Sequence, residues 1–257
     1  MSTTLIAHAE ELLARARSGV LCHTAFLTPA EQMQLRRALP HARTELLFLG
    51  GYEQAERRRA FFLPPYLLDV DEPTRMEWLA DTLAEVLIPV QITGSGYREL
   101  AHRDYLGSVL NLGLERAAIG DLCVLDPRTA VLFCDRVMCR FLQESLTRVA
   151  NDAVRVAPIT LPADFDGGRS FKPLSDTVAS PRLDSVVAAL ASLSRERAQQ
   201  LLREGAVELD YESADKPDRT VEEGAILTIR GKGKFVIRSL SQPTKKGRIR
   251  LLADQYL

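Results

Sequence analysis

The stretch from residue 86 to residue 160 constrains the fold most, because apolar runs of strand length alternate there with amphipathic runs of helical length. The order is strand, helix, strand, strand, helix, strand. This order is typical of the ferredoxin-like or RRM-like βαββαβ plan, in which two helices cover one face of an antiparallel sheet. The six segments, in chain order, are VLIPVQI, HRDYLGSVLNLG, IGDLCVLD, AVLFC, DRVMCRFLQESLTRV and AVRVAPI.

The first 85 residues predict a separate N-terminal domain of helices and a hairpin. Helical periodicity indicates helices at about 3–16, 29–39 and 72–85. Two apolar runs on either side of Gly50-Gly51 indicate a hairpin that ends at Pro64-Pro65.

The chain after residue 160 changes character. Residues 161–180 gather Pro, Gly, Asp and Ser without periodicity and are expected to be a linker. Residues 181–257 are expected to form a small module of two helices followed by strands. The predicted fold class is therefore α+β, with domains at 1–85, 86–160 and 181–257.

Composition gives no direct sign of a nucleic-acid partner, since 33 basic residues stand against 34 acidic ones in a chain of 257. Only a local basic patch could provide such a surface. The four cysteines form no Cys-x-x-Cys pair, and neither they nor the four histidines show metal-ligand spacing. No segment approaches the apolar length of a membrane span, so a cytoplasmic protein without metal or cofactor is expected.

Residues 180–209 carry the most informative polar pattern. Ser194 suits a helix N-cap, and Gly205 suits a helix stop. Between them, Arg195, Gln199 and Arg203 recur every fourth residue and form one row on the second helix. Such a row could match the spacing of phosphates, although a solvated helix face has the same pattern.

This stretch resembles the S-four RNA-binding domain, a family that binds structured RNA through a helix pair. The resemblance spans residues 181 to about 230, and one departure is Leu209-Asp210-Tyr211, where the family usually has Val-Asn-Gly. The positions that carry it are Arg182-Leu183-Asp184, Ser194-Arg195, Ala198, Leu202, Gly205, Val207, Val221, Gly224 and Ile229. The resemblance implies RNA contacts from Arg182, Ser194, Arg195, Arg197, Gln199, Gln200 and Arg203.

A further basic surface follows in the sequence. Four basic residues stand against one acidic residue in 241–257, so we expect RNA binding that weakens steeply with salt. The cations that extend the surface are Lys232, Lys234, Lys245, Lys246, Arg248 and Arg250.

Enzymatic alternatives depend on three local motifs. Arg182-Leu183-Asp184 also occurs in pseudouridine synthases, but an amphipathic helix follows here, so Asp184 is interpreted as a helix-start residue. Gly94 and Gly96 follow a strand, as in a methyltransferase loop, but no third glycine completes a dinucleotide fingerprint. His102-Arg103-Asp104 lacks the other kinase motifs.

The sheet of residues 86–160 offers only Phe133 where an RRM places several base-stacking aromatics. Base reading by that face is therefore not expected. We expect the face to dock on the N-terminal domain or on a protein or RNA surface.

Most of the chain resembles the YlmH family, called RqcP in some bacteria, most densely in HRDYLGSVLNLGLERAAIGDL and in the C-terminal module. The signature positions are His102, Arg103, Asp104, Gly107, Gly113, Arg116, Gly120 and Asp121. Gly113 is expected to end a helix, whereas His102, Arg103, Asp104 and Arg116 are candidates for a second RNA or partner contact.

The family resemblance implies a non-enzymatic factor that steadies tRNA against rRNA on the large ribosomal subunit. The pathway implied is ribosome-associated quality control, in which a tailing factor extends stalled nascent chains. Cyanobacterial proteins similar to this one carry a label that links them to photosystem II. The alternatives are an RNA-modifying enzyme and a scaffold for photosystem II or cell division.

Overall fold

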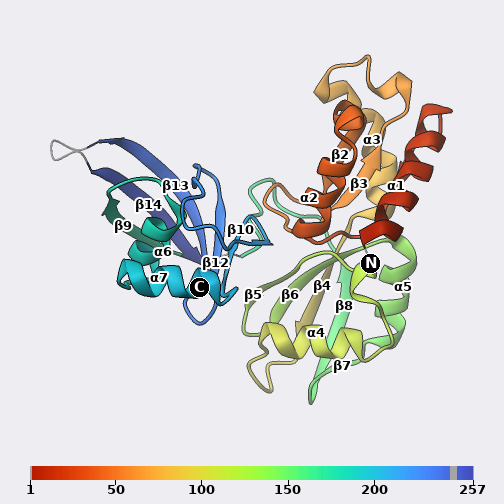
Figure 1. The fold of residues 1–257 in the computed structure, drawn as a ribbon. Helices are drawn as coiled ribbons and strands as arrows, with labels where there is room; N and C mark the ends of the chain where they lie inside the picture. The colour runs from red at the N-terminus through yellow and green to blue at the C-terminus, as the bar shows by residue number, and fades with distance from the viewer. Residues whose placement is uncertain (1, 169, 244–247, 257) are drawn as a thin grey trace. The chain divides into compact units, whose positions relative to one another are not determined.

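The computed structural model describes residues 2–168, 170–243 and 248–256. The chain divides into two compact units, Met1–Gly168 and Arg169–Leu257 (Figure 1). The two predicted segments 1–85 and 86–160 lie in the first unit, and their separation into two domains stays a prediction.

Residues 2–86 form helices around a small antiparallel sheet of strand order β1-β3-β2. The expected start of the second helix is confirmed, because Thr28 and Glu31 form a capping box there. The hairpin is confirmed as β2 and β3, to which a two-residue strand is added. The elements are α1 (Ser2–Arg17), β1 (Cys22–His23), α2 (Pro29–Ala38), β2 (Leu46–Leu49), β3 (Arg59–Phe62) and α3 (Glu72–Val86).

The next segment has the predicted βαββαβ order, with one short strand added. Its sheet is antiparallel and has the order β5-β6-β4-β8-β7. Both helices lie on one face of it (Figure 1). The elements are β4 (Ile88–Gly94), α4 (His102–Leu110), β5 (Leu122–Asp126), β6 (Thr129–Cys134), α5 (Arg136–Ser145), β7 (Arg148–Val149) and β8 (Asp152–Pro158).

The two faces of this sheet bury different partners. Val90 and Ile92 pack with the two helices, in a core that includes Tyr105 and Leu142. On the opposite face, Phe133 packs in a second core with residues of the N-terminal segment, among them Phe26, Phe61 and Leu63. The expected docking of this face on the N-terminal segment is thus observed around Phe133.

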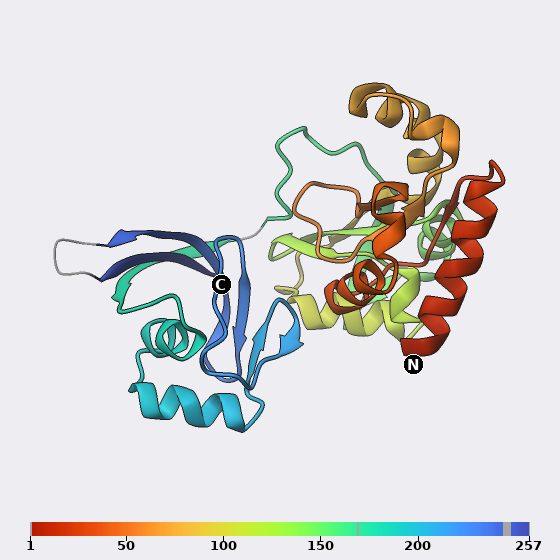
Figure 2. The same cartoon turned by 45° about the horizontal axis from the view of Figure 1, so that its top comes forward.

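The second unit places a helix pair against a six-stranded antiparallel sheet of order β11-β10-β12-β13-β14-β9. The two helices lie together on one side of the strands (Figure 2), and Leu183, Val187, Ala198 and Leu202 bury their apolar side in the core. The elements are β9 (Phe171–Val178), α6 (Leu183–Ala191), α7 (Arg195–Arg203), β10 (Val207–Leu209), β11 (Glu212–Ser213), β12 (Ile226–Ile229), β13 (Gly233–Pro243) and β14 (Ile249–Tyr256).

The expected linker at 161–180 is wrong for residues 171–178. They form β9, which pairs along its whole length with β14. The sequence hides this strand because most of its side chains are exposed or half-buried and Pro173 interrupts it. Proline is tolerated in an edge strand, where a missing N–H can face solvent, and β9 is the edge of its sheet.

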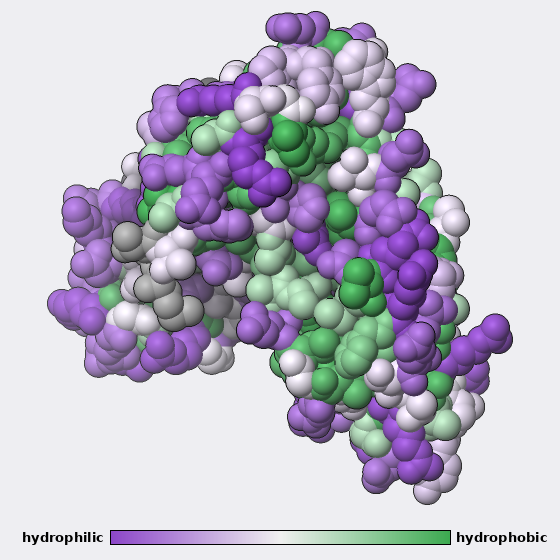
Figure 3. Space-filling view, turned by 90° about the vertical axis from the view of Figure 1, so that its right-hand side faces the viewer, coloured by the Kyte–Doolittle hydropathy of each residue, from purple (hydrophilic) through white to green (hydrophobic). Residues whose placement is uncertain are grey.

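Hydrophobic side chains are not confined to the cores. Tyr66, Trp78, Tyr97 and Val137 are each at least half exposed. On the face shown in Figure 3, hydrophobic residues are interspersed with hydrophilic ones, as is normal for a folded protein surface. Among the described residues, no helix is long and apolar enough to cross a membrane.

Candidate nucleic-acid interface

In the helix pair of the second unit, a defined N-cap residue precedes each helix. Arg182 is the N-cap residue of α6, and Ser194 caps α7 by accepting a hydrogen bond of 3.2 Å from the Arg197 N–H. Gly205 follows α7 with a φ of +62°, a left-handed conformation that glycine adopts without strain. The predicted cap and stop are therefore confirmed, and they fix where the polar side chains of α7 stand.

A buried carboxylate lies at the centre of this helix pair. The Asp184 side chain is fully buried at the start of α6. The Arg195 Nε donates to its Oδ2 over 2.9 Å, and the Gln199 Nε2 donates to the same oxygen over 2.9 Å. The Arg182 Nε donates to Oδ1 over 3.2 Å. Asp184 thus holds three of the predicted RNA-binding side chains in place.

The electrostatics favour a charged Asp184. Burial alone would raise the pKa of this carboxyl group, but hydrogen bonds from Arg195, Gln199 and Arg182 outweigh that cost and hold the pKa well below its ordinary range. Two guanidinium groups share one carboxylate, so the cluster keeps a net positive charge. The Arg182 and Arg195 side chains remain 39% and 53% exposed, which leaves that charge accessible.

The predicted row on α7 divides into two parts. Arg195 and Gln199 turn toward Asp184, whereas Arg203, one turn further on, has no side-chain partner among the described residues. On the neighbouring face, Arg197 and Gln200 both reach Glu204, over 3.5 and 2.8 Å. Ser194, Arg197, Gln199, Gln200 and Arg203 together line a shallow depression on the exposed side of α7.

Further basic side chains belong to the sheet. The Lys234 ammonium lies 4.7 Å from the ring centre of Tyr211 and 5.0 Å from that of Tyr256, so aromatic faces hold it. Lys232 is exposed in the turn between β12 and β13. Arg230, just before that turn, donates to the carbonyl of Gly205 over 3.4 Å and so brings the turn to the end of α7.

The remaining predicted cations lie on or beside β14. Arg248 and Arg250 are exposed, and the Arg248 Nη2 donates to the Thr177 carbonyl over 2.5 Å. Lys245 and Lys246 lie outside the described residues. Arg248 also lines a groove with Arg195 between β9 and the helix pair, so one side of this unit brings both arginines together.

The unusual Leu209-Asp210-Tyr211 segment keeps a tight hairpin. Asp210 and Tyr211 have φ values of +53° and +65° and join β10 to β11 in two residues. Asn-Gly is the usual solution for such a turn. The Asp210 carboxylate accepts the Ile226 N–H over 3.0 Å, which ties the turn to β12.

The second contact candidate lies at the start of α4 in the first unit. His102 and Arg103 are exposed there, and the Asp104 carboxylate accepts the Ala101 N–H over 2.9 Å, as a helix-start residue does. Partial desolvation and the nearby Arg116 lower the pKa of His102. The Arg116 Nη1 donates to the carbonyls of Ile119 and Gly120 over 2.9 and 2.8 Å. Their contact role stays a prediction.

The other signature positions have different structural reasons. Gly113 has a φ of +85° after α4, as expected for a helix stop. A Cβ on Gly120 would stand 2.8 Å from the Phe26 ring and 2.9 Å from the Phe133 Cβ. By contrast, a Cβ on Gly107 would meet nothing within 4 Å. Packing therefore explains Gly120 but does not explain Gly107.

Asp121 and Arg57 form a network that sequence reasoning missed. Asp121 is 8% exposed and accepts hydrogen bonds from the Tyr52 hydroxyl and from the backbone N–H groups of Glu56 and Arg57, over 2.7 to 2.9 Å. The Arg57 guanidinium donates to the carbonyls of Phe26, Arg116 and Ile119 over 3.0 to 3.1 Å. The network joins the N-terminal segment to the sheet.

The glycines of the proposed methyltransferase loop have local structural roles. A Cβ on Gly94 would stand 2.7 Å from the Asp152 Oδ2, and Gly96 has a φ of +91°. The loop follows a strand of an antiparallel sheet, whereas cofactor loops of the dinucleotide type follow a parallel strand of a βαβ unit. Within the part of the chain that the structure describes, no group of three His, Cys, Asp or Glu side chains could hold a metal ion.

Two regions of the chain match known protein families. Residues 85–163 match the family described as "Putative RNA-binding domain in YlmH", and residues 181–227 match the S4 domain family. Ribosome-associated protein quality control protein P2 of Bacillus subtilis (strain 168) is 30% identical over 232 residues, which cover 90% of this chain and 86% of that protein. Among solved structures, the cell division protein ylmH from Streptococcus pneumoniae matches with a TM-score of 0.46 and 16% identity, over 62% of this chain and 90% of that one.

Proposed function

The chain belongs to the YlmH family of RNA-binding proteins, and on that premise we propose that it docks its C-terminal helix pair on structured RNA of the large ribosomal subunit. The observation that carries the proposal is the buried Asp184, which fixes Arg182, Arg195 and Gln199 while leaving both guanidinium groups partly exposed. Side chains held on rigid helices can recognise the shape and the phosphates of folded RNA without entering its deep groove.

The proposed process is ribosome-associated quality control in the cytoplasm. The Bacillus subtilis relative is named for that process. For this chain we propose rRNA and tRNA as the bound RNAs and a nascent-chain tailing factor as a further partner. We also propose that the protein acts by binding and not by catalysis, which calorimetry with S-adenosylmethionine can test, because measurable binding would favour a methyltransferase.

Co-sedimentation with purified large subunits tests the docking proposal. The double variant Arg182→Ala/Arg195→Ala should bind roughly 10- to 100-fold more weakly, since it loses two charge-assisted contacts. Because it also leaves the buried Asp184 carboxylate without its two guanidinium partners, binding is measured under conditions where circular dichroism shows the variant to be folded. Its salt dependence should also be shallower by about two counterions. The matched control is Arg43→Ala/Arg140→Ala, which removes two exposed arginines from the first unit. Equal sedimentation of both double variants and the unmodified protein would contradict the proposed surface.

A further inference from the structure

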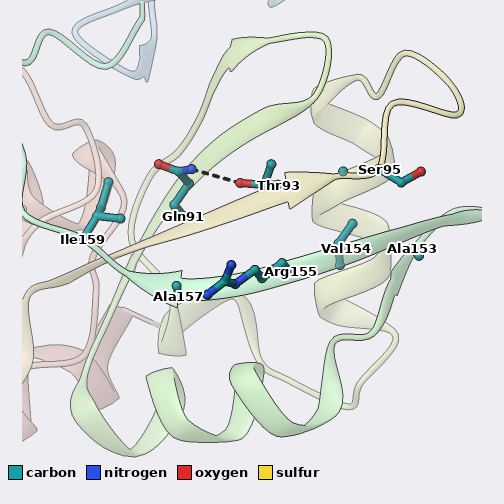
Figure 4. Close-up of a pocket in the computed structure, with 9 residues that line it drawn as sticks. Gln91, Thr93, Ser95, Ala153, Val154, Arg155, Ala157 and Ile159 are labelled. Carbon is teal, nitrogen blue, oxygen red and sulfur yellow. Dashed lines mark hydrogen bonds between the residues drawn. The ribbon is translucent and has the colours of Figure 1, made fainter.

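The sheet of the first unit is covered on only half of the face that points away from α4 and α5. Around Phe133 on β6, the N-terminal segment buries this face completely. Along β4 and β8 the face is hollowed instead, and the hollow has a volume of about 470 Å³ (Figure 4). We call it the β4/β8 groove. Its lining residues are Gln91, Thr93, Gly94, Ser95, Ala153, Val154, Arg155, Ala157 and Ile159.

The β4/β8 groove is lined by small side chains on β8 and by polar side chains on β4. Because Ala153 and Ala157 have small side chains, they leave space above β8. Gln91 and Thr93 stand side by side on β4, where the Gln91 Nε2 donates to the Thr93 Oγ1 over 2.9 Å (Figure 4). This bond leaves the Gln91 carbonyl oxygen to accept and the Thr93 hydroxyl to donate, and these two groups can pair with a donor and an acceptor of a base edge or a ribose.

The charge of the groove is positive. Arg155 is its only charged lining residue, it is exposed, and its guanidinium has no partner among the described residues. A second exposed cation, Arg128, lies against Gly96, where a Cβ would approach the Arg128 side chain to 3.3 Å. None of the lining residues is acidic, and the Asp152 carboxylate behind Gly94 is buried, so the exposed charge of the groove is positive.

An exposed aromatic residue, Tyr97, follows the groove residue Ser95 by two positions. Tyr97 is 82% exposed, the largest value among the large hydrophobic side chains described, in the loop that follows β4. The loop is held in place, because the Ser95 hydroxyl bonds to the buried Asp152 carboxylate and accepts the Tyr97 N–H over 3.2 Å. A fixed loop with an exposed ring is a platform on which a base can stack.

We propose that the β4/β8 groove binds an unpaired RNA strand, with Arg155 on its phosphates and Tyr97 stacked on a base. The proposal rests on the proposed function, since it gives the RNA-binding chain a second site of different specificity. The proposed base contacts lie beside β4 and β8, away from Phe133, which the N-terminal segment covers. An acidic peptide would match the charge of Arg155, and its backbone could pair with Gln91 and Thr93, but it has no base to stack on the exposed Tyr97 ring, so we favour RNA.

Fluorescence anisotropy with the full chain and two labelled RNAs tests this inference. One probe is a hairpin, and the other is the same hairpin with a short single-stranded oligouridine extension. The extension should strengthen binding to the unmodified protein about tenfold. Tyr97→Ala or Arg155→Glu should abolish this gain without changing the affinity for the plain hairpin. The control Arg140→Ala removes an exposed arginine from α5, on the opposite face of the sheet, and should change neither affinity.

The outcomes separate this inference from the docking proposal. If the extension adds nothing to the unmodified protein, or if Tyr97→Ala and Arg155→Glu keep its whole contribution, the groove is not an RNA site. Displacement of the extension by polyglutamate of equal charge as readily as by oligouridine would overturn the choice of RNA over an acidic protein. Loss of hairpin binding in Arg182→Ala/Arg195→Ala, with oligouridine binding retained, would support two independent sites.

Discussion

The two units each contain an aspartate that organises arginines and backbone groups, and the two networks have opposite exposure. In the first unit, Asp121 accepts from two backbone N–H groups and a tyrosine, and the neighbouring Arg57 is buried against carbonyl groups. In the second unit, the donors to Asp184 among the described residues are side chains, and its two arginines stay partly exposed. The first arrangement joins parts of the fold, whereas the second leaves positive charge exposed to solvent.

This comparison shows why a charged motif alone does not identify a binding site. Arg116 and Arg195 are both arginines at positions that a family resemblance singles out. Arg116 donates hydrogen bonds to the carbonyls of Ile119 and Gly120. Burial, and to a lesser extent the positive charge of the nearby Arg57, lowers the pKa of Arg116 to about 10. Arg195 bonds a carboxylate and keeps half of its side chain in solvent. We therefore expect substitutions in the two networks to separate stability from RNA binding.

The largest effect on stability is expected from Asp121→Ala. The change removes the hydrogen bonds described above from the Tyr52 hydroxyl and from the N–H groups of Glu56 and Arg57, and the Arg57 N–H is buried. We expect the free energy of unfolding of the first unit to fall by about 3 kcal/mol, measured by urea denaturation. The control Asp126→Ala alters an exposed aspartate of the same unit and should cost much less. If Asp121→Ala lost RNA binding but kept its stability, the Asp121 network would serve binding and not the fold, contrary to our account.

A smaller loss of stability, with a loss of binding, is expected from Asp184→Asn. The amide keeps the volume but cannot accept all the bonds from Arg182, Arg195 and Gln199. We expect about 2 kcal/mol less stability in the second unit and roughly tenfold weaker binding to structured RNA. Anisotropy at a temperature where the variant is folded separates the two effects. Unchanged binding in a folded variant would show that the orientation of these side chains is unimportant.

The smallest effect is an acid-dependent one. The pKa of Asp184 is lower in the folded chain than in the unfolded chain, so its contribution to stability is complete above about pH 4 and declines as the pH falls below that value. Between pH 5 and pH 3 the second unit should lose on the order of 1 kcal/mol through this group. Asp184→Asn should lose less over the same interval. Parallel pH profiles for the two proteins would argue against a low pKa for Asp184.

The local elements of the fold were predictable from sequence, because helical and strand periods are properties of neighbouring residues. The βαββαβ order, the Ser194 cap and the Gly205 stop belong to this class. Strand β9 was not predictable, since it is an edge strand with Pro173 and few buried side chains. Strands β1 and β11 have two residues each, too few to show any period.

The sequence singles out residues of the candidate site, but it does not predict the contacts that organise them. Arg182, Arg195 and Gln199 were identified from helical spacing and from the resemblance to the S-four domain. The role of Asp184 was underestimated, because its interpretation as a helix-start residue considered α6 alone. The carboxylate meets Arg195 and Gln199 only after α6 and α7 pack together. Likewise, the open half of the sheet could not be predicted before the N-terminal segment was seen to cover the other half.

RNA crosslinking in cells, followed by identification of both the RNA and the crosslinked peptide, tests the central claim most directly. The proposal predicts rRNA of the large subunit crosslinked to peptides that contain the helix pair, within residues 181–205. It also predicts that Arg182→Ala/Arg195→Ala removes those crosslinks while Arg43→Ala/Arg140→Ala preserves them. Crosslinks to the large subunit that involve only the first unit, unchanged in the Arg182→Ala/Arg195→Ala protein, would contradict the claim.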